Sequence, residues 1–269
     1  MNLGLEDKVA VVTGGTSGVG LATARLFLAE GAAVAICGRD EARLAAARES
    51  LEASLGNKAP DQRLLVQQCD VLDKAAVARF AAAVERWSGR CDILVNNAGQ
   101  ARMSTFADTT DEAWHEELEL KFFSQIYPVR AFKPMLDKSD AAAILAVNSL
   151  LAYQPEPYMV ATAAARAGAQ SLVKSLAREF APRIRVNSVM LGLIDTGQWE
   201  RRFVVRKDPT QTREQWFAEV ARTRHIPLER LGTSDEVARA IVFLCSPAAA
   251  FITGAQLEIS GGKIGRAHV

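Results

Sequence analysis

The stretch that decides the fold is Thr13-Gly14-Gly15-Thr16-Ser17-Gly18-Val19-Gly20, which stands between a predicted strand, Lys8–Thr13, and a predicted helix, Val19–Glu30. Glycines here let the backbone turn tightly and approach a pyrophosphate without a clash from a Cβ atom. The helix that follows offers free N–H groups and the positive end of its dipole to the phosphates. A strand before such a loop and a helix after it indicate a dinucleotide site. We therefore predict cofactor contacts for Gly14, Thr16, Ser17, Gly18, Val19 and Gly20.

Outward from this loop, short β-branched runs alternate with longer helical segments. Strands are predicted at Lys8–Thr13, Ala32–Cys37, Leu64–Cys69, Asp92–Asn96, Ala142–Ser149, Ile184–Met190 and Ala255–Ile259. Helices are predicted at Val19–Glu30, Glu41–Leu55, Ala75–Trp87, Glu112–Leu136 (as one helix or two), Tyr158–Phe180 and Ser234–Cys245. This alternation predicts an α/β fold of the Rossmann type, with a doubly wound, mainly parallel seven-stranded sheet and helices on both faces.

The length of 269 residues fits a single domain of this class, and the chain has no internal repeat or low-complexity linker. Residues 56–62 are expected to form a loop inside the domain. We expect one domain over residues 1–269, with a cofactor half at about 1–150 and a substrate loop or lid at about 193–230.

Composition excludes several classes of function. A net charge of +1, with basic residues scattered among acidic ones, gives no reason to expect nucleic acid or a membrane as a partner. The N-terminus does not resemble a signal peptide, and no apolar run reaches the roughly 18–20 residues that span a bilayer. The four cysteines, Cys37, Cys69, Cys91 and Cys245, are far apart, which predicts no metal site and a cytoplasmic setting. Cys37, Cys69 and Cys91 each stand at the edge of an apolar run and are expected to be buried.

Several further motifs resemble those of the short-chain dehydrogenase/reductase family over nearly the whole chain. The first loop has that family's glycine spacing, Gly-x-x-x-Gly-x-Gly. Ser149 ends the fifth predicted strand where the family has its catalytic serine, and Leu191 stands where the family usually has proline. The other matching segments are Cys69-Asp70-Val71, Asn96-Asn97-Ala98-Gly99, the positions Gly192, Ile194 and Thr196, and Ser260-Gly261-Gly262.

The resemblance implies hydride transfer between a nicotinamide cofactor and a carbonyl or alcohol substrate. It assigns adenine contacts to Asp70 and Val71, and further cofactor contacts to Asn97, Ala98 and Gly99. It assigns the nicotinamide side to Gly192 and Ile194. The small residues of 161–169 suit the helix–helix interface by which family members form tetramers, so we expect a homotetramer, with a dimer as the alternative.

The end of the second strand predicts which nicotinamide cofactor binds. An enzyme that prefers NAD usually has an acidic residue here to bind the ribose 2′-hydroxyl, and this chain has Gly38. Glycine leaves room for a 2′-phosphate, and the guanidinium of Arg39 can form charge-assisted hydrogen bonds with it. We therefore predict a preference for NADP(H), with Asp40 capping the next helix.

The catalytic centre departs from the family pattern, which has a tyrosine, a lysine four residues later, a serine and an asparagine. Aligning on Ser149 and Lys174 puts Thr162 at the tyrosine position and Arg166 at the lysine position. Aligning the earlier helix on Trp114 puts Lys121 at the asparagine position. The predicted catalytic group is Lys121, Ser149, Thr162 and Arg166.

These replacements change which side chain can supply a proton. An aliphatic hydroxyl ionises far less readily than a phenol, so Thr162 is expected to donate a hydrogen bond to a carbonyl oxygen rather than a proton. Arg166 is expected to bind ribose and to stabilise developing alkoxide charge. Burial beside Arg166 would lower the pKa of Lys121, which makes it the first candidate proton source. Tyr158 and then Tyr153 are the alternatives.

Two functions follow from these observations. The first is an NADPH-dependent reductase or dehydrogenase with an atypical centre, and the second is a cofactor-binding sensor or scaffold without turnover. Aromatic residues of the lid suggest either an apolar pocket or a local core; they are Trp199, Phe203, Trp216 and Phe217. Histidine catalysis and metal binding are not expected, because all three histidines lie outside the inferred site; they are His115, His225 and His268.

Overall fold

A computed structural model describes residues 2–55, 60–206 and 208–263 of the chain. It confirms a parallel seven-stranded sheet, with the order β3-β2-β1-β4-β5-β6-β9. The order reverses between β1 and β4, which is the switch point of a doubly wound sheet. The strands are β1 Val9–Thr13, β2 Ala33–Gly38, β3 Leu64–Gln68, β4 Ile93–Asn96, β5 Ala143–Ser149, β6 Arg185–Leu191 and β9 Gln256–Ile259.

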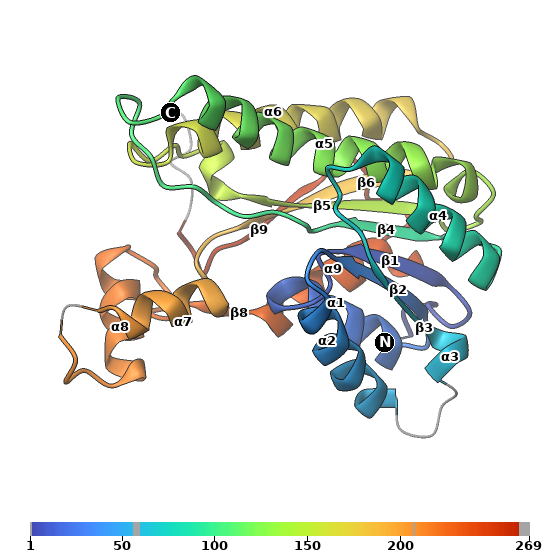
Figure 1. Cartoon of the computed structure of the whole chain (residues 1–269), viewed down its shortest axis with the longest axis horizontal. Helices are drawn as coiled ribbons and strands as arrows, with labels where there is room; N and C mark the ends of the chain where they lie inside the picture. Colours follow the sequence, from blue (N-terminus) through green and yellow to red (C-terminus); the bar gives the residue numbers. More distant parts are fainter. Residues whose placement is uncertain (1, 56–59, 207, 264–269) are drawn as a thin grey trace.

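The helices cover both faces of the sheet, as predicted (Figure 1). On one face are α1 Gly18–Ala29, α2 Glu41–Leu55 and α9 Ser234–Cys245. On the other are α4 Lys74–Ser88, α5 Asp111–Leu136 and α6 Val160–Glu179. Short 3₁₀ turns occupy Leu150–Ala152 and Pro247–Ala249. The segment expected to be one helix or two is a single helix, α5.

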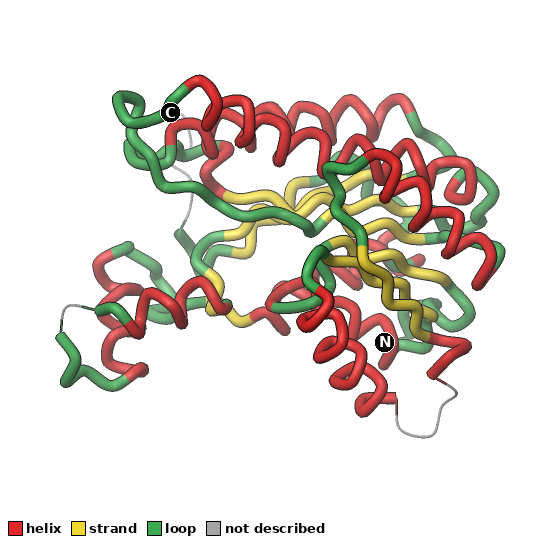
Figure 2. Tube along the Cα trace, viewed as in Figure 1, coloured by secondary structure: helices red, strands yellow, loops and turns green. Residues whose placement is uncertain are grey.

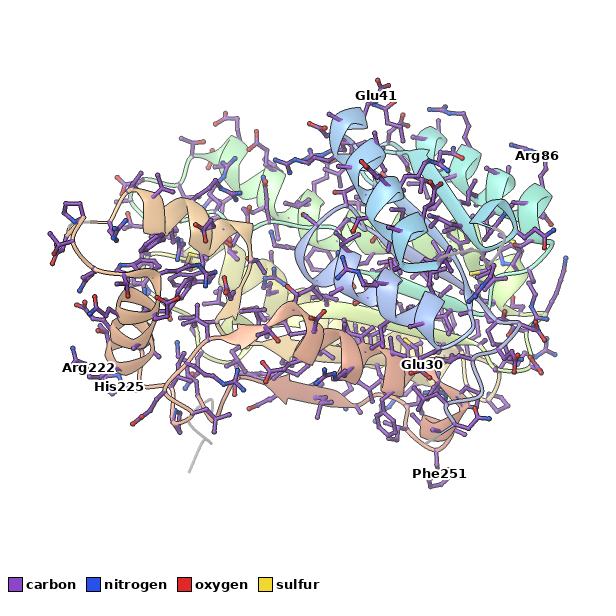
Figure 3. The ribbon with its side chains drawn as sticks, turned by 90° about the horizontal axis from the view of Figure 1, so that it is seen from below. Glu30, Glu41, Arg86, Arg222, His225 and Phe251 are labelled. Atoms are coloured by element: carbon purple, nitrogen blue, oxygen red, sulfur yellow. The ribbon has the colours of Figure 1, made fainter. Side chains whose placement is uncertain are left out.

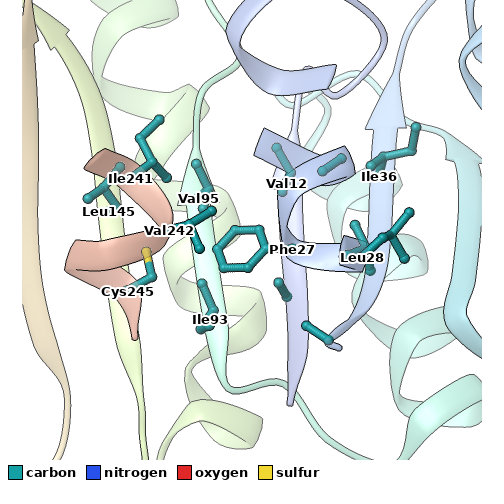
Figure 4. Close-up of a cluster of buried hydrophobic side chains, with 14 of the residues drawn as sticks. Val12, Phe27, Leu28, Ile36, Ile93, Val95, Leu145, Ile241, Val242 and Cys245 are labelled. Carbon is teal, nitrogen blue, oxygen red and sulfur yellow. The ribbon is translucent and has the colours of Figure 1, made fainter. Parts of the chain in front are cut away.

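Two apolar clusters, one on each face, hold the layers together. All five residues of β1 are buried, because helices cover both sides of this strand. Phe27 of α1 lies beside Val242 of α9, over the strands that carry Val12 and Val95 (Figure 4). The four cysteines are free and buried, which confirms that they pack as small apolar side chains.

The structure differs from the prediction at three places. Pro60–Arg63 forms a short helix, α3, where a loop was expected, while residues 56–59 lie outside the described part. Helix α6 begins at Val160 rather than at Tyr158, since Ser104 bridges to Met159 and holds it in an extended connection. Residues Ile194–Asp195 and Gly232–Thr233 pair as strands β7 and β8, which joins the two ends of the lid.

The lid is a helical hairpin that extends beyond the sheet (Figures 1 and 2). It contains α7 Gly197–Val204 and α8 Arg213–Thr223. Its aromatic residues form a local core, with the ring centroids of Trp199 and Trp216 6.0 Å apart, and Trp199 also borders a cavity. Both functions expected for these residues are thus present. Arg222 and His225 lie at the outer end of this hairpin (Figure 3).

Within the described ranges, we find no helix long and apolar enough to cross a bilayer.

A substitution at Gly20 tests how tightly the first loop is packed. An alanine Cβ at this position would lie 2.3 Å from the carbonyl oxygen of Gly14 and 2.5 Å from Asn97 Nδ2. We expect Gly20→Ala to lower the free energy of unfolding by about 1–3 kcal/mol, because the backbone must shift to make room. Urea unfolding measures this change. Gly197→Ala is the control, since its Cβ would meet only Arg201 Nη1 at 3.6 Å; equal stability of the two variants would contradict the prediction.

Candidate functional site

A cavity of about 350 Å³ opens at the carboxyl ends of β5 and β6. It is bordered by Ser149 from β5, Arg166 from α6 and Trp199 from the lid. Val19 of α1 and Ile194 of β7 complete its border toward the first loop. Ligands of doubly wound sheets bind outside the carboxyl ends of the strands, so this cavity is the candidate site.

The first loop is fixed against the end of β4. Gly14 has a φ of 65°, and a Cβ there would lie 2.9 Å from Ala98 Cα. Asn97 Nδ2 donates hydrogen bonds to the carbonyl oxygens of Thr13 and Gly14, both at 3.0 Å. The Asn97 side chain, predicted to contact cofactor, is therefore committed to holding the loop. Gly99 is exposed and leaves open space beside it.

The start of α1 fits a pyrophosphate. Its N-cap residue Ser17 is exposed and makes no side-chain capping hydrogen bond, and the first turn carries no acidic residue. The hydroxyl and the first N–H groups of the helix thus remain available to an anion. Thr16 and Gly18 flank Ser17, and Val19 continues from this loop into the border of the cavity.

The last residue of β2 is Gly38, so no acidic side chain stands at this position. A Cβ at Gly38 would lie 2.7 Å from Thr16 Cγ2, so glycine is favoured here by the close approach of the loop. Arg39 is exposed, and its carbonyl oxygen accepts a hydrogen bond from Gln68 Nε2 at 2.9 Å. Asp40 accepts a hydrogen bond from the amide of Arg43 at 2.9 Å, which agrees with its predicted capping role.

Asp70 and Val71 follow β3 at the same edge of the sheet. Asp70 is half-buried, and its Oδ1 accepts a hydrogen bond from the amide of Leu72 at 3.0 Å. Val71 is buried in the apolar cluster on the α4 side. This placement leaves Asp70 able to accept a further hydrogen bond through its second carboxylate oxygen.

A buried polar group lies between α5 and α6. Lys121 Nζ donates to Glu117 Oε2 at 3.0 Å, and the Thr162 hydroxyl lies 2.5 Å from the same oxygen. The exposed fractions are 4% for Lys121, 2% for Glu117 and 0% for Thr162. The Thr162 hydroxyl also lies 3.1 Å from the carbonyl oxygen of Arg102. This differs from the expectation that it faces a carbonyl substrate, because Glu117 and Arg102 occupy its hydrogen-bonding directions.

Burial shifts the acidity of both cations. Desolvation, followed by repulsion from Arg166, lowers the pKa of Lys121 to about 8, although Glu117 opposes the shift. Desolvation lowers the pKa of Arg166 to about 10, again with Glu117 opposing. Lys121 therefore holds a proton at neutral pH and releases it more readily than an exposed lysine. The expected burial of Lys121 near Arg166 agrees with this geometry.

Ser149 and Arg166 meet through Asn148. Arg166 Nη1 donates to Asn148 Oδ1 at 3.2 Å, and the same oxygen accepts the amide hydrogen of Ser149 at 2.9 Å. Arg166 Nε is buried and has no hydrogen-bond partner among the described residues. The Ser149 hydroxyl accepts only a long 3.3 Å hydrogen bond from the amide of Leu151, so its own hydrogen stays free to donate.

The two tyrosines considered as donors differ in position. The Tyr158 hydroxyl accepts a short hydrogen bond from Arg224 Nη1, and Tyr158 borders the cavity. The Tyr153 hydroxyl forms a short hydrogen bond to Gln256 Oε1, and Tyr153 is not part of the border. Burial, with Glu258 nearby, raises the pKa of Tyr153. Tyr158 is thus the better placed of the two.

The segment after β6 also borders the cavity. Gly192 approaches Ser260 so closely that a Cβ would lie 2.9 Å from Ser260 Cα. Its amide donates to the carbonyl oxygen of Ile259 at 3.0 Å, which ties it to β9. Ile194 is buried and, with Thr196, lines the cavity.

Two polar residues of the site escaped the sequence analysis. Glu117 lies one helical turn before Lys121, a spacing that a sequence presents as an ordinary surface ion pair. Asn148 precedes Ser149 in a strand that reads as apolar, yet it is 3% exposed and bonded to Arg166 and Gln170. The only available signal was a polar residue inside a predicted buried strand.

Neither of the two histidines that the structure describes belongs to this group. His115 is exposed on α5, His225 lies at the outer end of the lid, and His268 lies outside the described residues. Over the described ranges, no group of three or more His, Cys, Asp or Glu side chains is arranged to hold a metal ion.

The fold and the loop define a dinucleotide-binding α/β protein. Residues 14–263 match the family model described as Enoyl-(Acyl carrier protein) reductase. A 3-oxoacyl-[acyl-carrier-protein] reductase from Chlamydia muridarum is 32% identical over 265 residues, covering 97% of this chain and 99% of that protein. The chain therefore belongs to the short-chain dehydrogenase/reductase family.

Solved structures agree with this assignment. A short-chain oxidoreductase from Pseudomonas aeruginosa PAO1, described as containing an atypical catalytic center, is 56% identical in its apo form, with a TM-score of 0.94 and coverage of 98% of this chain and 100% of that one. Its NADPH-bound form has a TM-score of 0.91. L-Sorbose reductase from Gluconobacter frateurii, complexed with NADPH and L-sorbose, is 32% identical, with a TM-score of 0.92 and coverage of 99% and 100%.

Glu117 should matter for stability as well as for the site. Glu117→Gln removes the only carboxylate bonded to Lys121 in the described structure and leaves its charge buried near Arg166. We expect a loss of about 3–5 kcal/mol in the free energy of unfolding at pH 7. The loss should be smaller at pH 9, because the lysine can then be neutral in the folded protein.

Urea unfolding at the two pH values measures this effect. The double variant Glu117→Gln/Lys121→Met removes both charges and should recover much of the loss. A double variant no more stable than Glu117→Gln alone would refute the ion-pair explanation.

Proposed function

We propose that this protein is an NADP(H)-dependent oxidoreductase that transfers hydride between nicotinamide and a carbonyl or alcohol substrate. The observation that carries the proposal is one cavity bordered both by Ser149 and Arg166 and by residues of the cofactor side, Val19, Ile194 and Thr196. A substrate oxygen and a nicotinamide ring can meet only in such a shared space.

Support for NADP(H) comes from the edge of the sheet beside β2. Gly38 leaves no acidic group to bind a 2′-hydroxyl, and the Arg39 side chain forms no ion pair within the described structure. The relatives from P. aeruginosa and G. frateurii, which bind NADPH, support the same choice. We propose that Ser17 and the amides of α1 hold the pyrophosphate and that Arg39 holds the 2′-phosphate.

The bound nicotinamide supplies the hydride that adds to the carbonyl carbon. Ser149 donates its hydroxyl hydrogen to the carbonyl oxygen and fixes the substrate. Arg166 stays protonated at neutral pH, so its guanidinium stabilises the negative charge that develops on that oxygen. Asn148 positions both groups, because its Oδ1 accepts hydrogen bonds from each.

Lys121 is the proposed source of the proton that converts the developing alkoxide to an alcohol; because Lys121 does not itself border the cavity, the proton would pass through water or the Ser149 hydroxyl. Glu117 and Thr162 act as positioning residues, since they hold the buried amine beside α6. After each turnover the amine regains its proton from solvent. Tyr158 is the alternative donor, because it borders the cavity directly. The expected cytoplasmic location and homotetramer form part of the proposal.

The first test follows the absorbance of NADPH in the presence of aldehydes, ketones and quinones, after calorimetry has measured cofactor binding. Oxidation of NADPH that depends on any carbonyl establishes a reductase. Tight NADPH binding without turnover over the whole panel would overturn the catalytic proposal and favour a sensor or scaffold.

Arg39→Ala tests the cofactor preference. Loss of the guanidinium should weaken NADPH binding by about 10- to 100-fold, the effect of a charge-assisted hydrogen bond, and should change NADH binding far less. Calorimetry of both cofactors gives the ratio. Arg86→Ala, at the exposed end of α4 and remote from the lid (Figure 3), is the control. Equal losses for the two cofactors would argue against a 2′-phosphate contact.

The dependence of carbonyl reduction on pH tests Lys121. Reduction needs the protonated amine, so kcat should fall as pH rises through about 8, the pKa of Lys121. Glu117→Gln removes a group that raises this pKa, so the alkaline limb should move to lower pH. Lys121→Met should lower kcat at least about 100-fold.

The control for that profile is Lys138→Met, an exposed lysine just beyond α5. If the limb stays unchanged in Glu117→Gln and disappears in Tyr158→Phe, the proton comes from Tyr158 and the assignment of Lys121 is wrong.

A further inference from the structure

The cavity carries an excess of positive charge. Four of its bordering side chains are cationic and one is acidic. They come from five separate elements: Arg166 from α6, Arg202 from α7, Arg224 after α8, Lys263 after β9, and Glu156 in the loop after β5. Among the bordering side chains, positive charges therefore exceed negative ones by three, an excess that an uncharged substrate would not need.

The single acid is already shared. Glu156 forms ion pairs with Arg224 Nη1 at 3.2 Å and with Lys263 Nζ at 3.3 Å. These contacts, together with a hydrogen bond from Tyr158, lower the pKa of Glu156 against the opposing effect of burial. Glu156 is therefore ionised at neutral pH and partly neutralises two of the cations, but it makes no ion pair with Arg202.

Arg202 differs from two other arginines of the lid, Arg206 and Arg213. Arg213 pairs with Asp195 at 2.7 Å and with Glu200 at 3.0 Å. Arg206 donates to the main-chain oxygens of Pro209 and Gln211, at 2.7 and 3.0 Å. These two guanidiniums are thus bound by groups of the protein itself.

Arg202 instead has no carboxylate partner in the described part of the chain. It is half-buried, its guanidinium lies 4.6 Å from the centre of the Trp199 ring, and Nη2 reaches only Met103 Sδ, at 3.3 Å. A thioether is a weak acceptor, whereas a guanidinium has five N–H donors. The cation–π contact with Trp199 uses none of these N–H donors.

The acidic residue of the adjoining cavity does not neutralise Arg202. Glu219 borders a smaller adjoining cavity together with Arg202, but its Oε2 accepts a hydrogen bond from Gln211 Nε2 at 2.5 Å, and it forms no ion pair with Arg202. Arg202 therefore borders the main cavity as a cation that no carboxylate of the described residues pairs with.

We infer that Arg202 binds an anionic group of the substrate, so that the substrate is a small carbonyl compound carrying a carboxylate or a phosphate. This inference rests on the proposed function for the identity of the reacting carbonyl. Arginine suits both anions, because its fork of donors matches two oxygens of either one. The carbonyl lies at Ser149 and the anion at Arg202, and the apolar side chains of Leu151, Met159 and Leu193 also border this cavity.

Three matched pairs of compounds test the inference: 4-oxopentanoate and its methyl ester, phenylpyruvate and its methyl ester, and fructose 6-phosphate and fructose. Calorimetry with the full chain, with and without saturating NADP⁺, measures binding without turnover. We expect the anionic member of at least one pair to bind about 10-fold or more tightly than its neutral partner. The carboxylate and phosphate pairs distinguish the two anions.

Arg202→Met should remove this preference and leave binding of the neutral member within about 3-fold, because methionine keeps an apolar stem on Trp199. Arg202→Lys should keep part of it, since the charge remains and the fork is lost. Arg201→Met, its exposed neighbour on α7, is the control and should keep the full preference.

The outcomes separate the inference from the proposed function. Anion preference that depends on Arg202, without oxidation of NADPH, would keep the inference about the ligand and overturn the catalytic proposal. Turnover of carbonyls without any preference within the three pairs, or a preference that survives Arg202→Met, would overturn the inference. Absence of preferential binding in all pairs, with or without NADP⁺, would overturn it as well.

Discussion

Asn97 joins the ends of β1 and β4 at the point where the strand order reverses, and the candidate site is built around this junction. Its side-chain amide donates to two successive carbonyl oxygens of the first loop, Thr13 and Gly14, at 3.0 Å. The Thr13 hydroxyl in turn accepts hydrogen bonds from the backbone amides of Asn97 and Ala98. The loop can approach β4 this closely only because Gly14 and Gly20 lack side chains. The start of α1 is thereby aimed at the edge where β5 and β6 end.

The second constraint is electrostatic and lies on the other side of the cavity. Two cations, Lys121 and Arg166, are largely withdrawn from water with one carboxylate, Glu117, interacting with both. Desolvation disfavours both charges, and their mutual repulsion adds to it. Lys121 has the lower pKa of the two, so it is the cation that can release a proton near neutral pH. Thr162 limits the freedom of Glu117, because its hydroxyl lies against the same carboxylate oxygen.

The sequence predicted the sheet and the loop, and it singled out Lys121, Thr162 and Arg166 but not Glu117, because these predictions depend on local patterns and on fixed spacing along a helix. Thr162 and Arg166 lie one helical turn apart, and Ser149 ends a strand, so their proximity follows from the fold. The direction of the Thr162 hydroxyl could not be predicted, since Glu117 and Arg102 reach it from distant parts of the chain. The sequence also could not show that Arg202 lacks a carboxylate partner among the described residues, because only the folded lid shows that Asp195 and Glu200 pair with Arg213.

The proposed centre has Thr162 and Arg166 where the family has Tyr and Lys. In both arrangements a neighbouring cation lowers the pKa of the proton donor. A cation beside a phenol lowers the pKa of the phenol by stabilising the anion that remains after the proton leaves. A cation beside an amine lowers its pKa by destabilising the ammonium that holds the proton. Both arrangements move an acid with an ordinary pKa near 10 toward neutrality. Arg166 can therefore lower the pKa of Lys121, as the family's lysine lowers the pKa of its tyrosine. Burial is the larger cause of the shift, which brings the pKa of Lys121 to about 8.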